Sequence, residues 1–484
     1  MAESTLKQKT ASGLFWGGLS TGAQQLISLV FGIFLARLLN PDDYGLVGML
    51  AIFTAIASTI INSGFSTALT NKKNATEDDY NAVFWFTVFA GLLLYLVLYF
   101  CAPFIARFFE RPELTDLSRV LFISFFIGGI GTVSHTILFK KIMAKQQAII
   151  DLVALLSSLV IGILLAFNGF AYWALAIQTV IQVSLGSILR FIIAPWKPSV
   201  TIRFSPLKPM LSFSIKLFLT NIFMQINTYL FTVIFGKFYN AEQVGYYTQG
   251  QKWMVMGNAF TGGMINYVAQ PILVQMNEDK DRQVGVLRKL IRFGAFVSCP
   301  LMLGLAFIGK EFIVIAIGEK WLPAVPFLQL FCIWGAVAYL WNVFTNLIFT
   351  HGKSNIFMYV TLITGLLQLL VVVCMYPFGI FPMVIGYLLM NIVGLFIWQY
   401  YTHKLIGLRL MDVLKDILPY LGITLGCFLV TWLLTKNIVN LYWLMIAKIV
   451  ISGVLYILIL KWSHSVIFKE SMDYITNIWK KSRS

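Results

Sequence analysis

Charged residues are scarce in this chain. Asp, Glu, Lys and Arg make up 12% of its 484 residues, whereas soluble domains carry about 25%. Apolar residues account for 59%, and the mean hydropathy is +0.81. Because the shortage of charge extends over the whole length, it excludes an ordinary soluble protein. It predicts an all-α polytopic membrane protein.

The cysteines lack any spacing that is associated with redox or metal chemistry. There is no CxxC pair, and no histidine stands at ligand spacing from a cysteine. We interpret all five as small core residues, and we expect no disulfide, no metal site and no cofactor. They are Cys101, Cys299, Cys332, Cys374 and Cys427.

Catalytic motifs are also missing from the sequence. It has no Walker A motif and no Ser-His-Asp set on one side of the membrane, and no loop is long enough to form a domain. These absences predict that the protein is not an enzyme.

No carboxylate is predicted in the middle of the membrane. All twenty acidic residues are expected in loops or at the ends of spans, and Asp151 and Glu242 come closest to the membrane. Ion-coupled transporters often use a buried acid as their relay. The pattern therefore argues against a drug exporter that works through such an acid.

Apolar stretches of about 20 residues predict fourteen membrane spans. Two sets of six are followed by a final pair, near 12–37, 43–63, 81–104, 117–139, 149–168, 170–194, 209–236, 242–273, 286–308, 325–350, 355–376, 379–401, 414–434 and 440–461. With the N-terminus inside, 25 of the 36 Lys and Arg residues fall on the inner side and nine on the outer side. This distribution predicts that both termini are cytoplasmic, and it explains the net charge of +16 without nucleic-acid binding.

A short pattern occurs twice, 200 residues apart. Residues 36–49 and 236–249 each join two predicted spans, and the offset matches Asn40 with Asn240 and Gly45 with Gly245. Over residues 12–45 the same offset gives six identities in 34 positions. Both asparagines are predicted to cap a helix. We interpret the chain as two six-helix lobes related by a parallel repeat, residues 1–200 and 201–403. Two extra spans and a basic cytoplasmic tail follow over residues 404–484.

The candidate substrate-binding residues are bases and amides inside predicted spans. Lys252 lies about ten residues into the eighth span, and it is interpreted as an anion contact or as a helix–helix hydrogen bond. Lys216 lies about two turns into the seventh span, where it either faces a cavity or extends to the interface. Asn221 and Gln225 share one face of that span. The remaining candidates, for which interhelical hydrogen bonding is the alternative, are Gln24, Gln25, Asn62 and Gln249.

Two stretches carry a resemblance to a known family. They are GLFWGGLSTGAQQLISLVFGIFLARLLNPDDYGLVGM near the N-terminus and GEKWLPAVPFLQ near residue 320. Together with the arrangement of spans, they resemble the polysaccharide flippases of the multidrug/oligosaccharidyl-lipid/polysaccharide exporter superfamily. The branch is that of the Wzx-type O-unit, colanic-acid and teichuronic-acid exporters. The resemblance covers most of the chain, and LARLLNPDDYG is its most specific part.

The resemblance implies a function in the bacterial cytoplasmic (inner) membrane. It implies two lobes around a central cavity formed largely by spans 1, 2, 7 and 8. Alternating access would move an undecaprenyl-pyrophosphate-linked oligosaccharide to the outer leaflet, for the synthesis of O-antigen, capsule or exopolysaccharide. A basic cavity suits a pyrophosphate, and amides suit sugar hydroxyls.

Partners and alternative functions follow from the same comparison. The implied partners are the polyprenyl-pyrophosphate-linked substrate, membrane lipids, a polysaccharide polymerase and chain-length proteins, with no nucleic acid. A multidrug or small-solute antiporter of the same superfamily remains open. A membrane glycan polymerase or ligase is a further alternative, against which the short loops argue.

Overall fold

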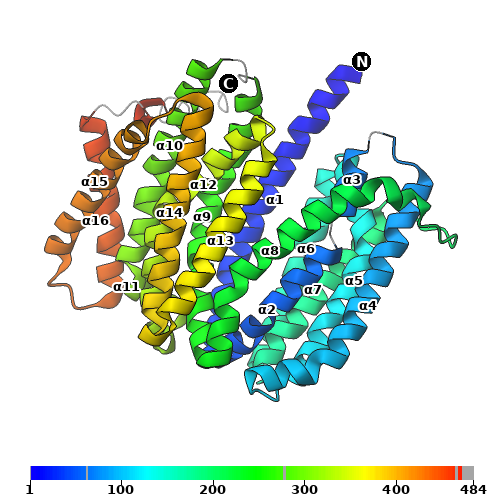
Figure 1. The fold of residues 1–484 in the computed structure, drawn as a ribbon. Coiled ribbons are helices and arrows are strands. Elements are labelled where there is room, and N and C mark those ends of the chain that lie inside the picture. Colours follow the sequence, from blue (N-terminus) through cyan, green and yellow to red (C-terminus); the bar gives the residue numbers. More distant parts are fainter. Residues whose placement is uncertain (1, 62–63, 73, 276–278, 464–466, 471–484) are drawn as a thin grey trace, which may run out of the picture. The chain divides into compact units, whose positions relative to one another are not determined.

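The protein is described here from a computed structural model that covers residues 2–61, 64–72, 74–275, 279–463 and 467–470. Within these ranges the chain is helical and contains no strand (Figure 1). The predicted all-α fold is therefore confirmed. The chain forms two compact units, Met1–Thr248 and Gln249–Ser484. The predicted basic tail falls largely on residues 471–484, outside the described ranges.

Unit 1 contains most of the long helices of the N-terminal half. In Figure 1, α4 to α7 run side by side, and α8 packs along α2 and α3. The elements are α1 (Ala2–Leu38), α2 (Pro41–Ile61), α3 (Gly64–Asn71), α4 (Glu77–Phe109), α5 (Leu114–Lys140), α6 (Ala144–Phe167), α7 (Tyr172–Ile193), the 3₁₀ turn η1 (Ser205–Leu207), α8 (Lys208–Phe238) and the start of α9 (Ala241–Gln275).

Unit 2 begins inside α9 and continues to the last helices. Its elements are α10 (Lys280–Phe307), α11 (Gly309–Ile317), η2 (Glu319–Ala324), α12 (Val325–Thr350), α13 (Ser354–Met375), η3 (Tyr376–Phe378), α14 (Ile380–Ile406), α15 (Leu410–Thr435) and α16 (Leu441–Trp462).

Twelve stretches of the described residues are helical, long and apolar enough to cross a membrane. The two other long helices, α8 and α9, coincide with the predicted seventh and eighth spans, whose sequences are unusually polar. The chain is thus a multi-span membrane protein, while the total of fourteen spans stays a prediction.

A capping box begins α4. The Asp79 N–H donates to the Thr76 side chain, and the Asp79 carboxylate accepts from the Thr76 N–H at 2.9 Å. This capping box satisfies two backbone donors that the helix itself leaves free. Lys72 also contacts the Asp79 carboxylate, with 2.6 Å between Nζ and Oδ2.

The two copies of the duplicated pattern pack against each other inside unit 1. A methyl group on Gly45 would lie 1.7 Å from the carbonyl oxygen of Ala241. A methyl group on Gly245 would lie 2.0 Å from the carbonyl oxygen of Pro41. The contacts are reciprocal, and the same offset of 200 residues relates them. Only glycine allows the backbones to approach this closely at both points.

The predicted asparagine cap is present in the second copy, whereas the first copy is capped differently. In the second copy the Asn240 side chain accepts from the Gln243 N–H at 2.8 Å, as expected. In the first copy the bond runs the other way, because the Asp43 carboxylate accepts from the Asn40 N–H at 2.8 Å. An aspartate three residues after the cap position can reach back to the backbone, whereas the second copy has a glutamine there.

The loop between α4 and α5 ties both copies together. Arg111 donates to both carboxylate oxygens of Asp42, at 2.9 and 2.6 Å. The neighbouring Glu110 accepts from Lys237 at 2.8 Å. Asp42 belongs to the first copy and Lys237 to the second. One short loop therefore holds both helix junctions by charged hydrogen bonds.

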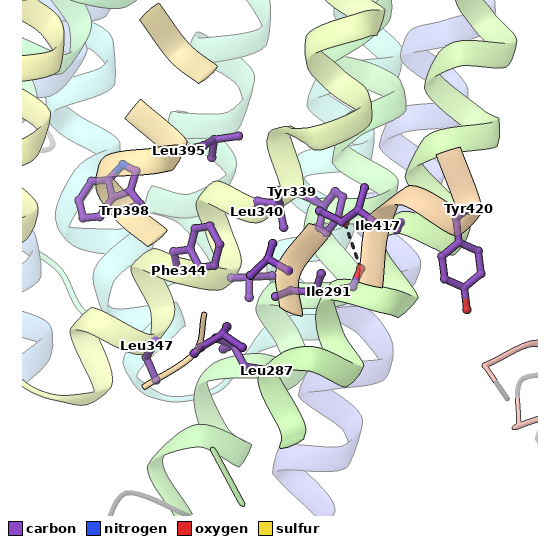
Figure 2. Packing of buried hydrophobic residues seen from close by; sticks show 14 of the residues in the cluster. Leu287, Ile291, Tyr339, Leu340, Phe344, Leu347, Leu395, Trp398, Ile417 and Tyr420 are labelled. Carbon is purple, nitrogen blue, oxygen red and sulfur yellow. Dashed lines mark hydrogen bonds between the residues drawn. The ribbon is translucent and has the colours of Figure 1, made fainter. Parts of the chain in front are cut away.

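A large apolar cluster forms the core of unit 2. Figure 2 shows side chains of α10, α12, α14 and α15 meeting around Tyr339, Phe344 and Trp398. The hydroxyl of Tyr339, which is fully buried, donates to the carbonyl oxygen of Ile291 at 3.0 Å. The same cluster includes Ile417 of α15, so it anchors the first of the two extra helices.

Ion pairs with buried carboxylates also attach the last two helices to the rest of unit 2. On α15, Asp416 is only 4% exposed and accepts from Arg288 at 2.8 and 3.0 Å. On α16, Lys448 donates to Glu311 at 2.7 Å, and both side chains are buried. Glu311 lies between two of the candidate spans and Asp416 in the second turn of α15, so the expected placement of the acidic residues in loops and at span ends stays a prediction. Each carboxylate is retained in the interior because a base on a neighbouring helix compensates it.

Candidate functional site

A polar cavity lies inside unit 1, between α1, α2, α5, α6 and α7. Its volume is about 700 Å³, within the range of sites that take small organic ligands. Nine of its lining residues have polar side chains, and they are Gln24, Ser58, Ser124, Thr132, His135, Asp151, Gln182, Ser187 and Arg190. In a helix bundle of low charge, this concentration of polar groups marks the cavity as a candidate binding site.

The cavity extends along the helices rather than across them. Its lining on α5 runs from Ser124 to His135, and its lining on α7 runs from Gln182 to Arg190. At 1.5 Å per residue these stretches span about 16 Å and about 12 Å. The ligand space is therefore elongated. Under the predicted topology, the end with His135 and Arg190 faces the cytoplasm.

An ion pair closes that end of the lining. The Nη2 atom of Arg190 donates to Oδ1 of Asp151, which joins α7 to α6. Both side chains remain partly exposed, at 22% for Arg190 and 32% for Asp151. The Nε atom of Arg190 is buried and has no hydrogen-bond partner among the described residues. Because this atom is buried, it lies out of contact with the open space of the cavity.

The other polar side chains supply neutral donors and acceptors. His135 is exposed although it belongs to the interior of the bundle, because it borders the cavity. The Gln24 amide nitrogen donates to the Ser20 hydroxyl at 2.9 Å. The amide oxygen of Gln24 can accept from another partner. Gln182 adds a second amide from the opposite helix. The set suits a ligand that is rich in hydroxyl groups.

Of the predicted site residues in unit 1 whose side chains the structure describes, only Gln24 lines this cavity. Gln25, its neighbour on α1, is half-buried and lies outside the lining. On α8, Asn221 is exposed and Gln225 is half-buried, and neither belongs to the lining. Asn62 lies outside the described residues, and the side chain of Lys216 on α8 is not described. A role for these residues stays a prediction.

The two predicted site residues in unit 2 follow each other on α9. Gln249 is 1% exposed, and neither polar atom of its amide has a partner among the described residues. The ammonium of Lys252 lies 5.6 Å from the ring centroid of Trp253. An anion at Lys252 is not tested by this geometry. Both polar atoms of the Gln249 amide are buried, and its role in substrate binding stays a prediction.

Sequence reasoning missed the ion pair of the cavity. Asp151 is expected at the start of a span, and it lies two turns after the start of α6. Arg190 is one of the 25 Lys and Arg residues predicted on the inner side. The available signal was their position, since both lie near the predicted cytoplasmic ends of consecutive spans. Two opposite charges at similar depth on neighbouring helices predict a pair.

Comparison with known proteins adds an independent line of evidence. The sequence pattern of a family described as "Polysaccharide biosynthesis protein" matches residues 34–326. A Klebsiella pneumoniae protein described as an uncharacterized membrane protein in the cps region is 27% identical over 360 residues, which cover 73% of each chain. The teichuronic acid biosynthesis protein TuaB of Bacillus subtilis (strain 168) is 26% identical over 358 residues, 73% of this chain and 74% of that protein.

A solved structure shares the fold. The lipid II flippase MurJ, in an inward closed conformation, superposes with a TM-score of 0.74 and 16% sequence identity. The match covers 96% of this chain and all of the other. At this identity the likeness concerns the architecture alone.

Proposed function

Since this chain belongs to the polysaccharide biosynthesis protein family, we propose that it is a flippase for a lipid-linked oligosaccharide. It would move a polyprenyl-pyrophosphate-linked glycan from the cytoplasmic to the outer leaflet of the bacterial cytoplasmic membrane by alternating access. The glycan would serve the synthesis of a surface polysaccharide. The protein performs transport and no covalent chemistry in this proposal.

The polar cavity of unit 1 is the observation that carries the proposal. Polar side chains are costly inside membrane helices that face only lipid or each other, so nine of them around 700 Å³ of space indicate a polar ligand. A glycan presents many hydroxyl groups, and these match the hydroxyl, amide and charged side chains of the cavity. The fold shared with a lipid II flippase supports the same class of transport.

The pyrophosphate requires a different chemistry from the glycan. Its negative charges need cationic or strong hydrogen-bond donors. We assign this role to Lys252, with Lys216 as a second base, and we propose Asn221, Gln225, Gln249, Gln25 and Asn62 as further substrate-binding residues. The termini are cytoplasmic in this assignment, and the glycan polymerase and chain-length proteins act on the exported product.

Complementation of a strain that lacks its own flippase tests the function. Wild-type protein should restore surface polysaccharide and remove the lipid-linked precursor that accumulates in the inner leaflet. A drug or small-solute antiporter would restore neither, and it would raise resistance to toxic solutes instead.

Variants of Lys252 test the anion contact in the same strain. Lys252→Ala should lose most export at normal protein abundance, because an anion needs a positive partner in the membrane. Lys252→Arg should keep part of the export, since the charge remains but the geometry changes. Lys216→Ala should show a weaker loss. Normal export by Lys252→Ala or by Lys252→Gln would remove the need for a charge at this position.

A further inference from the structure

We propose that the cavity of unit 1 binds an uncharged sugar residue of the lipid-linked oligosaccharide, and not its pyrophosphate. This inference rests on the proposed function, and it assigns the glycan and the pyrophosphate of the substrate to separate sites. The glycan end of the substrate is recognised by the bundle of α1, α2, α5, α6 and α7, and the charged linkage is held elsewhere.

The charge of the lining favours a neutral ligand. Asp151 and Arg190 carry opposite charges and bind each other, so together they add no net charge. His135 is the one further ionisable side chain in the lining. A pyrophosphate would need an excess of cationic donors, and it would meet the Asp151 carboxylate at the same end. The site therefore disfavours the pyrophosphate and accepts a ligand without charge.

The shapes of the polar groups match the edge of a sugar ring. The carboxylate of Asp151, the guanidinium of Arg190 and the amides of Gln24 and Gln182 are planar groups with polar atoms side by side. Adjacent hydroxyls of a sugar offer hydrogen-bonding atoms at a similar spacing, so one such group can bind two of them.

The remaining lining supplies space and an apolar surface. Phe125 of α5 belongs to the lining and offers an aromatic surface to the C–H groups of a sugar. Gly128 and Gly186 also belong to the lining, where they present no side chain. The depth of about 12–16 Å, from the rise of the lining helices, lets a chain of sugars enter lengthwise. A single inorganic ion would leave most of this space unused.

A purely structural ion pair is the rival explanation. In that case Asp151 and Arg190 only join α6 to α7, and their loss lowers protein abundance without changing what is bound. The double variant Asp151→Arg/Arg190→Asp separates the two explanations. It can rebuild a tie between the helices, but it exchanges the positions of the carboxylate and the guanidinium that a sugar would meet.

Binding of two lipids to the full-length protein in nanodiscs provides the test. The probes are the lipid-linked oligosaccharide extracted from the strain that makes the glycan, and polyprenyl pyrophosphate without sugar. The variants are Asp151→Asn, Arg190→Gln and Gln182→Ala. The matched control is Asp116→Asn, which removes a carboxylate from the exposed ion pair with Arg119 outside the cavity. Dissociation constants are measured by native mass spectrometry.

Wild-type protein should bind the glycan-bearing lipid at least about tenfold more tightly than polyprenyl pyrophosphate. Each cavity variant should lose about tenfold for the glycan-bearing lipid and keep its affinity for polyprenyl pyrophosphate. The control should behave as wild type, and the double variant should keep its abundance without regaining the preference for the glycan.

Three other outcomes would overturn the inference. An equal loss for both lipids places the pyrophosphate in the cavity, and unchanged affinities in every variant remove the sugar from it. A full return of the preference in the double variant makes the ion pair structural. Failure of wild-type protein to bind either lipid would instead refute the flippase function itself, and the inference with it.

Discussion

Replacement of Gly45 or Gly245 by alanine should strongly destabilise unit 1. The added methyl group would lie 1.7 Å from a backbone carbonyl oxygen in the first case and 2.0 Å in the second. To reach even 3.0 Å, the two backbones must separate by about 1 Å or more. No flexible side chain can yield, because the opposing atoms belong to the main chain.

The expected cost is large for so small a change. Overpacking in a well-packed interior costs about 1–3 kcal/mol, and we expect the upper end because helix backbones must move. The reciprocal contact adds a sharper expectation, which is that both variants lose similar stability. The measurement is thermal unfolding of the purified protein in detergent, followed by size-exclusion chromatography with fluorescence detection.

Gly22→Ala is the matched control for these variants. Gly22 is exposed on α1, and nothing lies within 4 Å of a methyl group there. This change should keep or slightly raise the unfolding temperature, because alanine is favoured over glycine in helices by about 1 kcal/mol. An unfolding temperature of Gly45→Ala or Gly245→Ala equal to that of Gly22→Ala would refute the close approach of the two junctions.

Three further changes test other contacts. Asp416→Asn should lower the free energy of unfolding by about 2–4 kcal/mol, because it leaves two partly exposed arginines beside a buried amide. An unchanged midpoint of thermal unfolding would contradict the anchoring of α15. Asn240→Ala should lower the free energy of unfolding by about 1 kcal/mol in the same assay, and Asn40→Ala should lower it clearly less. Of the two asparagines, Asn240 alone caps its helix through the side chain, so equal losses would contradict the capping bonds described above. The hydrogen bond from Lys237 lowers the pKa of Glu110, so this pair stabilises the fold at neutral pH and loses that effect as the pH falls below about 4.3. Glu110→Gln should make the stability slightly less dependent on pH in this range, and the difference from wild type should shrink at high salt. An identical pH profile in both proteins would show that the Lys237–Glu110 pair does not contribute to stability.

The membrane helices could be predicted from the sequence because each depends on local composition. A stretch of about 20 apolar residues specifies a span almost without regard to the rest of the chain. The capping box of α4 was predictable for the same reason, since Thr76 and Asp79 are three residues apart. Such features need no knowledge of which helix lies beside which.

The cavity could not be assembled from the sequence because its residues come from five helices. Asp151 and Arg190 are 39 residues apart, and their pairing depends on how α6 and α7 are rotated about their axes. Glu311 and Lys448 pair across 137 residues. Periodicity identifies the face on which a residue lies, but it does not identify the partner of that face. Gln24 could be singled out from the sequence because an amide inside a span needs a polar neighbour wherever it lies. It lines the cavity of unit 1, and its role in substrate binding stays a prediction.

Transbilayer movement of the substrate is the most direct test of the central claim. Purified protein is reconstituted into liposomes that contain the lipid-linked oligosaccharide in both leaflets, and a glycan-cleaving enzyme that cannot cross the membrane is added outside. A flippase should drain the protected inner-leaflet pool, so that cleavage proceeds beyond the outer-leaflet fraction seen in protein-free liposomes. Cleavage that stops at the protein-free level, with correctly folded protein in the membrane, would contradict the proposed function.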